Sequence, residues 1–130
     1  MKTIEVVAAI ILKDDKIFCT QRGYGEFIDK WEFPGGKIEP NESKEDALVR
    51  EIKEELNADI IINQFLNTIE YDYPNFHLIM HNYICHLKDN KFTLLEHEAA
   101  KFVHLNELDN IDFLPADVLV VNKLKEVLKI

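Results

Sequence analysis

The chain has 130 residues and a formal net charge of -9, and 47% of its residues are hydrophobic while 30% are charged. This composition is typical of one globular domain and excludes an intrinsically disordered chain. The acidic excess argues against a nucleic acid polymer or an anionic membrane as partner, and it means that an anionic ligand would need a cation as intermediary. Two cysteines without a CxxC pattern indicate a reducing, cytoplasmic location.

The first third of the chain predicts short strands separated by turns. Residues 3–13 and 17–22 are rich in β-branched and aromatic residues, and the polar turn 14–16 separates them. Residues 23–30 are polar and contain glycines, as a loop does. Residues 31–42 hold two prolines and a glycine pair, which predicts a loop or a short strand at most. We find no linker or repeat, so we expect a single domain over residues 1–130.

A helix is predicted from Ser43 to about Leu56. Ser43 is a good N-cap residue, and Asn57 stands where a left-handed C-cap is expected. The buried face of this helix should be the apolar stripe Leu48, Val49, Ile52 and Leu56.

The rest of the chain predicts further strands and a second helix. The expected strands cover residues 58–71, 76–87, 92–96 and 101–105, with a hairpin turn at 88–91. A helical apolar pattern starts at Pro115 and continues to the C-terminal lysines. The order of elements predicts an α+β fold in which a mixed sheet is sandwiched between helices.

The first helix carries three glutamates, the first of which lies three and four residues before the other two, and like charges at this spacing destabilise a helix. Glu51, Glu54 and Glu55 lie together on the flank beside the apolar stripe. A solvated surface is one interpretation. The other is a site for a hard cation such as Mg²⁺, which prefers a few carboxylates together with water and phosphate oxygens.

The stretch from Gly36 to Ala58 resembles the signature of the Nudix hydrolases, Gly-x5-Glu-x7-Arg-Glu-U-x-Glu-Glu-x-Gly-U, where U is a bulky apolar residue. The positions that match are Gly36, Glu42, Arg50, Glu51, Ile52, Glu54 and Glu55. Asn57 replaces the second glycine, and Ala58 is small for the last position. The segments "WEFPGGKIE" (31–39), "EYDYP" (70–74) and "FLPAD" (113–117) look like the MutT branch of that family.

This resemblance implies a Nudix α/β/α fold and a Mg²⁺-dependent hydrolase, with Mn²⁺ as a substitute. Enzymes of the MutT branch attack the β-phosphorus of a nucleoside triphosphate and release the monophosphate and pyrophosphate, which clears 8-oxo-dGTP from the nucleotide pool. The alternatives are a CTP or 5-methyl-dCTP pyrophosphohydrolase, a hydrolase of another nucleoside diphosphate derivative, or a non-catalytic nucleotide-binding module. We expect the protein to be a monomer or a homodimer.

The same resemblance implies the roles of the residues around the metal. The proposed ligands are the backbone carbonyl of Gly35 and the side chains of Glu51, Glu54 and Glu55. Glu54 or Glu55 would also help to activate water, while Glu42 would support the ligands and Arg50 would orient them. A further acid comes from a loop in this family. Glu96 fits best and Glu98 is its rival, although either residue could equally be a solvated acid.

The resemblance also implies contacts to substrate. Arg22 and Lys37 are positioned like phosphate contacts, with solvated surface cations as the alternative. The nucleoside would be lined by Phe76, Asp117 and the segment containing Glu32, Phe33 and Gly35. Asp117 stands where MutT has Asn, and helix capping is its alternative role. As an ionised carboxylate it could only accept, from the N7–H of 8-oxoguanine or from N4 of cytosine.

Overall fold

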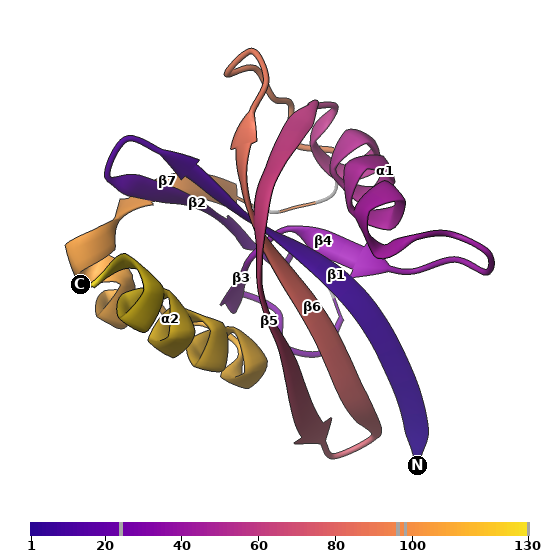
Figure 1. Cartoon of the computed structure of the whole chain (residues 1–130). Helices are drawn as coiled ribbons and strands as arrows, with labels where there is room; N and C mark the ends of the chain where they lie inside the picture. The colour runs from indigo at the N-terminus through magenta and orange to yellow at the C-terminus, as the bar shows by residue number, and fades with distance from the viewer. Residues whose placement is uncertain (24, 96, 98, 130) are drawn as a thin grey trace.

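A mixed β-sheet lies between two helices, which confirms the predicted α+β sandwich (Figure 1). This computed structural model describes residues 1–23, 25–95, 97 and 99–129. The seven strands formed by these residues are β1 (Lys2–Lys13), β2 (Lys16–Gln21), β3 (Trp31–Glu32), β4 (Gly35–Lys37), β5 (Ile60–Tyr73), β6 (Phe76–Leu87) and β7 (Ala99–His104). The main path through the sheet runs β3-β2-β1-β6-β5.

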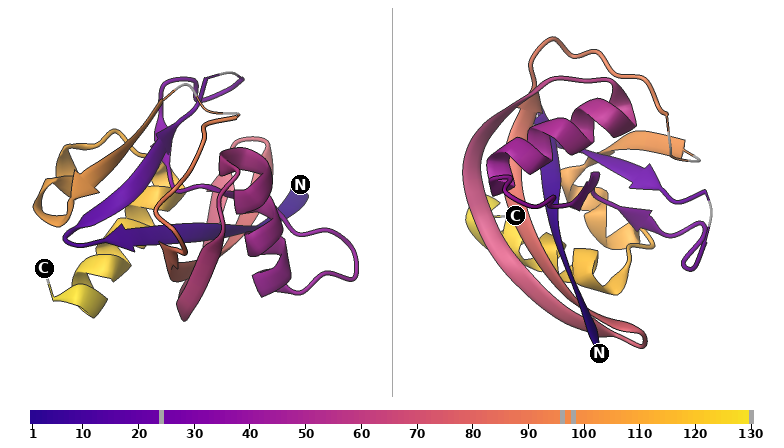
Figure 2. Two further views of the ribbon diagram at one scale, coloured as in Figure 1. Left: turned by 90° about the horizontal axis from the view of Figure 1, so that it is seen from above. Right: turned by 90° about the vertical axis from the view of Figure 1, so that its right-hand side faces the viewer.

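Strand β1 is the centre of this sheet. It pairs in parallel with β6 over ten residue pairs from Lys2 to Ile11, whereas its pairings with β2 and β4 are antiparallel. The side chains of β1 alternate between the two faces of the sheet, as in any strand. Val7, Ala9 and Ile11 belong to the core under α1 (Lys44–Leu56), and Ala8 and Ile10 belong to the core under α2 (Pro115–Leu128). The two helices therefore cover opposite faces (Figure 2).

Helix α1 begins and ends where the sequence predicts. The Ser43 hydroxyl accepts a hydrogen bond from the Asp46 N–H at 3.0 Å, and Asn57 adopts a left-handed conformation with φ 48°. The predicted apolar stripe is wrong at one position, because Val49 is 42% exposed and Ala47 is buried instead. This rotation of the buried face brings Glu55 into it, where the residue is only 6% exposed.

The predicted strand 92–96 and its hairpin turn are wrong for the residues that the structure describes. Residues 92–95 form no strand and lie beside the C-terminus of α1. The N–H of Thr93 donates to the Leu56 carbonyl at 2.6 Å, and the N–H of Leu95 donates to the Glu55 carbonyl at 3.0 Å. The last carbonyls of a helix lack partners within the helix, so this segment satisfies them instead of extending the sheet. The chain then enters β7, which is followed by a 3₁₀ helix, η1 (Leu105–Asn110).

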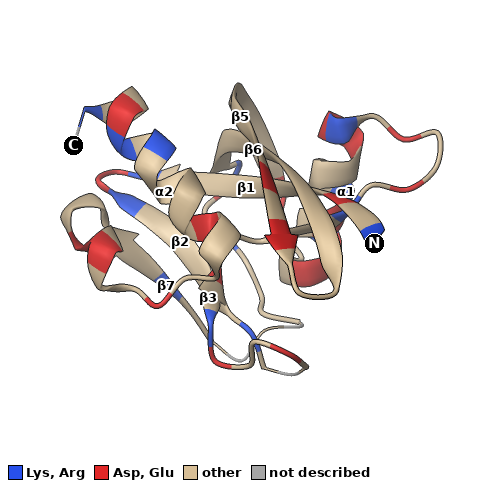
Figure 3. Ribbon diagram, turned by 90° about the horizontal axis from the view of Figure 1, so that it is seen from below, with Lys and Arg blue, Asp and Glu red and all other residues tan. Residues whose placement is uncertain are grey.

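Charged residues are sparse on the central strands and frequent on the helices, loops and turns (Figure 3). Within the part of the chain that the structure describes, we find no helix whose length and hydropathy would allow it to cross a membrane.

Candidate active site

Arg50 organises the acidic flank of α1. Its Nε and Nη2 donate to the two oxygens of Glu42 at 2.7 and 2.9 Å, a two-pronged contact from the loop before the helix. Its Nη1 lies 2.9 Å from Glu51 and 3.2 Å from Glu54, and its Nη2 also donates to the Lys37 carbonyl at 3.0 Å. A planar guanidinium has five N–H groups for such a network, so it fixes carboxylates more rigidly than an ammonium could.

These contacts keep Glu42 ionised. Hydrogen bonds from Arg50, and then from the Glu39 N–H, lower the pKa of Glu42 to about 2. Arg50 and Glu54, four residues apart on the helix, also form an ion pair at 3.2 Å. Arg50 thus contacts Glu42 and two of the three proposed metal ligands, which is the geometry of a residue that orients them.

Two glycines allow β4 to lie close to its neighbours. A Cβ at Gly36 would lie 2.3 Å from an oxygen of Glu51, and a Cβ at Gly35 would lie 1.9 Å from the Val7 carbonyl oxygen. Real Cβ atoms do not approach so closely, so any side chain at Gly36 would push the Glu51 carboxylate away. The first glycine of the motif therefore makes the space that this carboxylate occupies.

Glu55 differs from the other two glutamates because it is buried. Its side chain is 8% exposed, against 15% for Glu51 and 54% for Glu54. The Nε2 of His97 lies 3.5 Å from a Glu55 oxygen, and burial lowers the pKa of His97. Burying a carboxylate costs free energy unless partners compensate it. The interpretation of the three glutamates as a solvated surface therefore does not apply to Glu55.

The donor set fits a hard divalent cation. Glu51, Glu54 and Glu55 supply carboxylate oxygens from one flank of α1, and the Gly35–Gly36 backbone lies next to that flank. Among the described residues, no three His, Cys, Asp or Glu side chains already converge on one point. The Nη1 of Arg50 holds both Glu51 and Glu54 on this flank. Glu96 and Glu98 lie outside the described residues.

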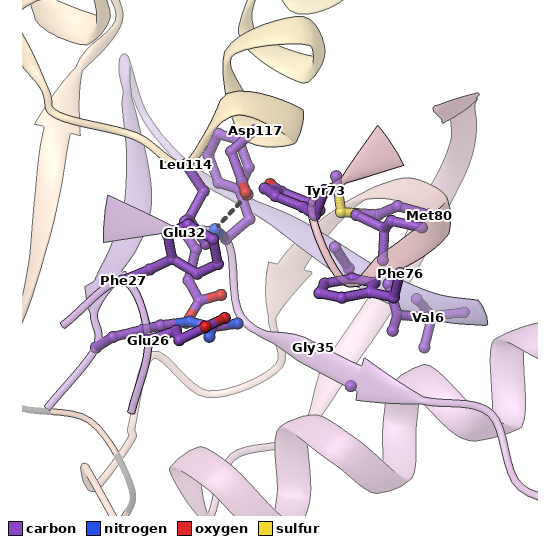
Figure 4. A pocket seen from close by; sticks show the side chains of 16 residues that line it. Val6, Glu26, Phe27, Glu32, Gly35, Tyr73, Phe76, Met80, Leu114 and Asp117 are labelled. Carbon is purple, nitrogen blue, oxygen red and sulfur yellow. Dashed lines mark hydrogen bonds and ion pairs between the residues drawn. The ribbon is translucent and has the colours of Figure 1, made fainter. Parts of the chain in front are cut away.

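A cavity of about 200 Å³ opens beside β4, and most of the residues predicted to contact substrate line it. The predicted residues that line it are Arg22, Glu32, Phe33, Gly35, Phe76 and Asp117 (Figure 4). They come from β3, β4, β6 and α2, and from the connections that follow β2 and β3. Gly36 also lines the cavity, so the cavity and the acidic flank of α1 share the β4 backbone.

Asp117 is not the cap of α2. The N-cap position is Leu114, and Asp117 lies in the first turn, with its Oδ1 accepting a hydrogen bond from the Phe33 N–H at 3.0 Å. Burial, with the charge of Glu32 second, raises the pKa of Asp117 from 3.8 to about 8. Burial therefore favours the protonated carboxyl over the ionised form. The protonated carboxyl can donate as well as accept, as the Asn of MutT can.

The two predicted phosphate contacts occupy different places. The Arg22 Nε donates to Glu32 at 3.0 Å at the cavity wall, and its side chain is 40% exposed. Lys37 is exposed at the end of β4, where its carbonyl accepts from Arg50. Arg22 thus lies at the cavity, whereas Lys37 lies beside the acidic flank.

Sequence reasoning missed part of the cavity wall. Phe27, Tyr73 and Phe76 form a row of rings, with centroids 5.4 Å apart between Phe27 and Tyr73 and 5.1 Å between Tyr73 and Phe76. Tyr73 belongs to the MutT-like segment "EYDYP", so the resemblance could have indicated it as a cavity residue. Phe27 lies in a polar loop, and no sequence pattern indicated it. Its φ of 64° is left-handed, which is unusual for a bulky residue and frequent at functional sites.

The comparisons with known proteins agree with this geometry. The pattern of the NUDIX domain matches residues 2–123. The CTP pyrophosphohydrolase of Escherichia coli (strain K12) is 37% identical over 121 residues, covering 91% of this chain and 88% of that relative. The 8-oxo-dGTP diphosphatase of the same organism is 32% identical over 127 residues, covering 96% and 98%. The solution NMR structure of the DNA mismatch repair protein MutT (family Nudix hydrolase) from methicillin-resistant Staphylococcus aureus 252 is 41% identical. It has a TM-score of 0.77 and covers 98% of this chain and 99% of that one.

Proposed function

The chain belongs to the NUDIX family, and from that premise we propose that it is a Mg²⁺-dependent nucleoside triphosphate pyrophosphohydrolase, for which Mn²⁺ can substitute. The observation that carries this proposal is the buried Glu55 beside Glu51 and Glu54, on a helix flank that shares the β4 backbone with a cavity. Such a site joins metal ligands to a pocket for an organic group.

The side chains of Glu51, Glu54 and Glu55 and the carbonyl of Gly35 would hold the ion. When bound, a divalent cation neutralises phosphate charge and lowers the pKa of a bound water. Arg50 and Glu42 position the ligands through the network of hydrogen bonds around the guanidinium. Glu96 or Glu98 would supply the loop acid.

In the proposed reaction, the oxygen of a water molecule forms a bond to the β-phosphorus. The bond from the β-phosphorus to the α–β bridging oxygen breaks, and its electron pair stays on that oxygen, which leaves with the nucleoside monophosphate. Glu54 or Glu55 accepts the proton of the water, and pyrophosphate is the other product. Arg22 and Lys37 would contact the phosphates.

The proposal is tested by metal removal and by the position of cleavage. We expect EDTA to abolish triphosphate hydrolysis and Mg²⁺ or Mn²⁺ to restore it. In H₂¹⁸O the label should enter pyrophosphate, as mass spectrometry of both products would record. Full turnover in metal-free buffer would contradict the role of the glutamates. Label in the monophosphate would contradict attack at the β-phosphorus.

We propose 8-oxo-dGTP as the substrate, in a role that sanitises the cytoplasmic nucleotide pool. A neutral Asp117 supports this choice, because its carboxyl can accept from N7–H and donate to a carbonyl of the oxidised base. CTP or 5-methyl-dCTP is the second candidate, favoured by the 37% identity to the CTP pyrophosphohydrolase. Steady-state kinetics on a panel of canonical, oxidised and methylated triphosphates separates the two.

A further inference from the structure

The lining of the cavity contains more acidic than basic residues. Within the described part of the chain, its charged lining residues are Arg22, Glu26, Glu32 and Asp117, so three carboxyl groups face one guanidinium. Arg22 pairs with Glu32 at 3.0 Å, so Glu26 is the ionised lining residue whose charge Arg22 does not offset in this way. Asp117 holds a proton at neutral pH, in part because of the nearby charge of Glu32. A neutral base would not offset this negative potential.

The opposite wall is aromatic. Figure 4 shows Glu26 and Glu32 on one side of the cavity and Phe76 on the other, with Asp117 beside Tyr73. The rings of Tyr73 and Phe76 are nearly parallel, 28° apart, and the Phe27 ring lies 5.4 Å from Tyr73 on the side of Glu26 and Glu32. The faces of aromatic rings attract cations, and the attraction grows when water is excluded. A flat cation in this cavity would stack on an aromatic ring, and the Glu26 carboxylate would offset its charge.

We propose that this cavity accepts bases that carry a positive charge, namely nucleobases methylated at a ring nitrogen, in preference to the neutral parent base. The inference rests on the proposed function, because it takes the cavity as the base site of a triphosphate hydrolase. The reaction is otherwise the same: one water is consumed, the β-phosphorus bond to the α–β bridging oxygen breaks, and the methylated monophosphate and pyrophosphate are released.

Cytidine triphosphates give a matched set of probes. 3-Methyl-CTP carries its methyl group on a ring nitrogen and is cationic at neutral pH, whereas 5-methyl-CTP carries a methyl group on carbon and is neutral. We expect kcat/KM for 3-methyl-CTP to exceed that for CTP by about tenfold or more, as a partly desolvated cation–π contact with added carboxylate attraction supplies. The 5-methyl compound should not show this gain. Equal values for CTP and 3-methyl-CTP, or equal gains for both methylated compounds, would overturn the inference.

Variants of two residues that line the cavity test whether its wall causes this preference. Glu26→Gln should lower the ratio of kcat/KM between 3-methyl-CTP and CTP, because it removes a charge that lines the cavity. Asp29→Asn is the matched control, since Asp29 is exposed in the same loop and does not line the cavity. Phe76→Leu should lower the same ratio by roughly two- to fivefold. A ratio that is unchanged in both Glu26→Gln and Phe76→Leu would contradict the assignment.

Binding of the monophosphates without metal separates this inference from the proposed function. We expect 3-methyl-CMP to bind more tightly than CMP in isothermal titration calorimetry with EDTA present. If no triphosphate is hydrolysed but 3-methyl-CMP binds more tightly, the proposed function fails and the preference stands. If triphosphates are hydrolysed and the two monophosphates bind equally, the preference fails alone.

Discussion

Asp117 shows at the scale of one residue how burial changes chemistry. The sequence gives an acid, and an acid in water is ionised at neutral pH. In the fold its oxygen accepts from the Phe33 N–H, 84 positions away in sequence, and the side chain is 4% exposed. One backbone N–H does not replace the water lost, so the carboxyl keeps its proton up to a pH of about 8.

This protonation should make the stability of the protein depend on pH. The folded state keeps a proton on Asp117 that the unfolded chain releases near its usual pKa of 3.8, so raising the pH towards 8 stabilises the unfolded state. Asp117→Asn removes the titration and keeps the acceptor for Phe33. Between pH 5 and pH 8 we therefore expect the free energy of unfolding of the variant to rise relative to wild type by about 1 kcal/mol or more. Urea titrations at several pH values measure it; a difference that does not change with pH would contradict a buried, protonated Asp117.

Glu55 should matter for turnover more than for folding. Glu55→Gln keeps the shape of a side chain that is buried beside His97 and removes its charge. We expect a folded protein with kcat reduced on the order of 10²-fold or more, as loss of an electrostatic group at a reacting centre does. Glu126→Gln on α2 is the control, because it removes the same charge at an exposed position. Circular dichroism reports folding, and wild-type turnover in Glu55→Gln would make the buried glutamate structural.

At the scale of elements, residues 92–95 act as a strap across the end of α1. Two of their N–H groups donate to the carbonyls of Glu55 and Leu56, and the Phe92 ring packs 4.8 Å from Phe18. The strap also leads directly into residues 96–98, where the loop acid is expected. The end of the helix that carries the proposed metal ligands is thus joined to the position proposed for the loop acid by a short stretch of chain.

Thr93→Pro tests this connection, because proline has no N–H to donate to the Leu56 carbonyl. We expect a loss of about 1–3 kcal/mol in the free energy of unfolding, the cost of an unsatisfied backbone group, together with a lower kcat. Thr93→Ala keeps the N–H and serves as the control. Denaturant titrations and steady-state kinetics measure both effects. If the two variants behave alike, the Thr93 side chain rather than its backbone is responsible.

Local and long-range elements differed in how far the sequence could predict them. Helix α1 was predicted from end to end because its caps and its charged motif lie within 24 consecutive residues, from 35 to 58. The strap was mistaken for a strand because its pattern is β-like and its partner is a helix end. The cavity was predicted only in part. The hydrogen bond between Phe33 and Asp117 and the row from Phe27 to Phe76 depend on which strands pair, and no local pattern encodes that.

At the scale of the whole molecule, the net charge of -9 opposes the compact state by self-repulsion, and any salt should relieve part of it. A divalent cation that binds the α1 flank should do more, because it binds the folded state specifically. At a concentration 100 times its Kd, Mg²⁺ should add about 2.7 kcal/mol of stability beyond that of NaCl at equal ionic strength. Differential scanning calorimetry measures the shift in Tm. Glu54→Gln, which changes the most exposed of the three glutamates, should lose much of the Mg²⁺-specific part and keep the response to NaCl. Equal shifts with the two salts in the wild-type protein would mean that Mg²⁺ only screens charge and that the α1 flank does not bind it.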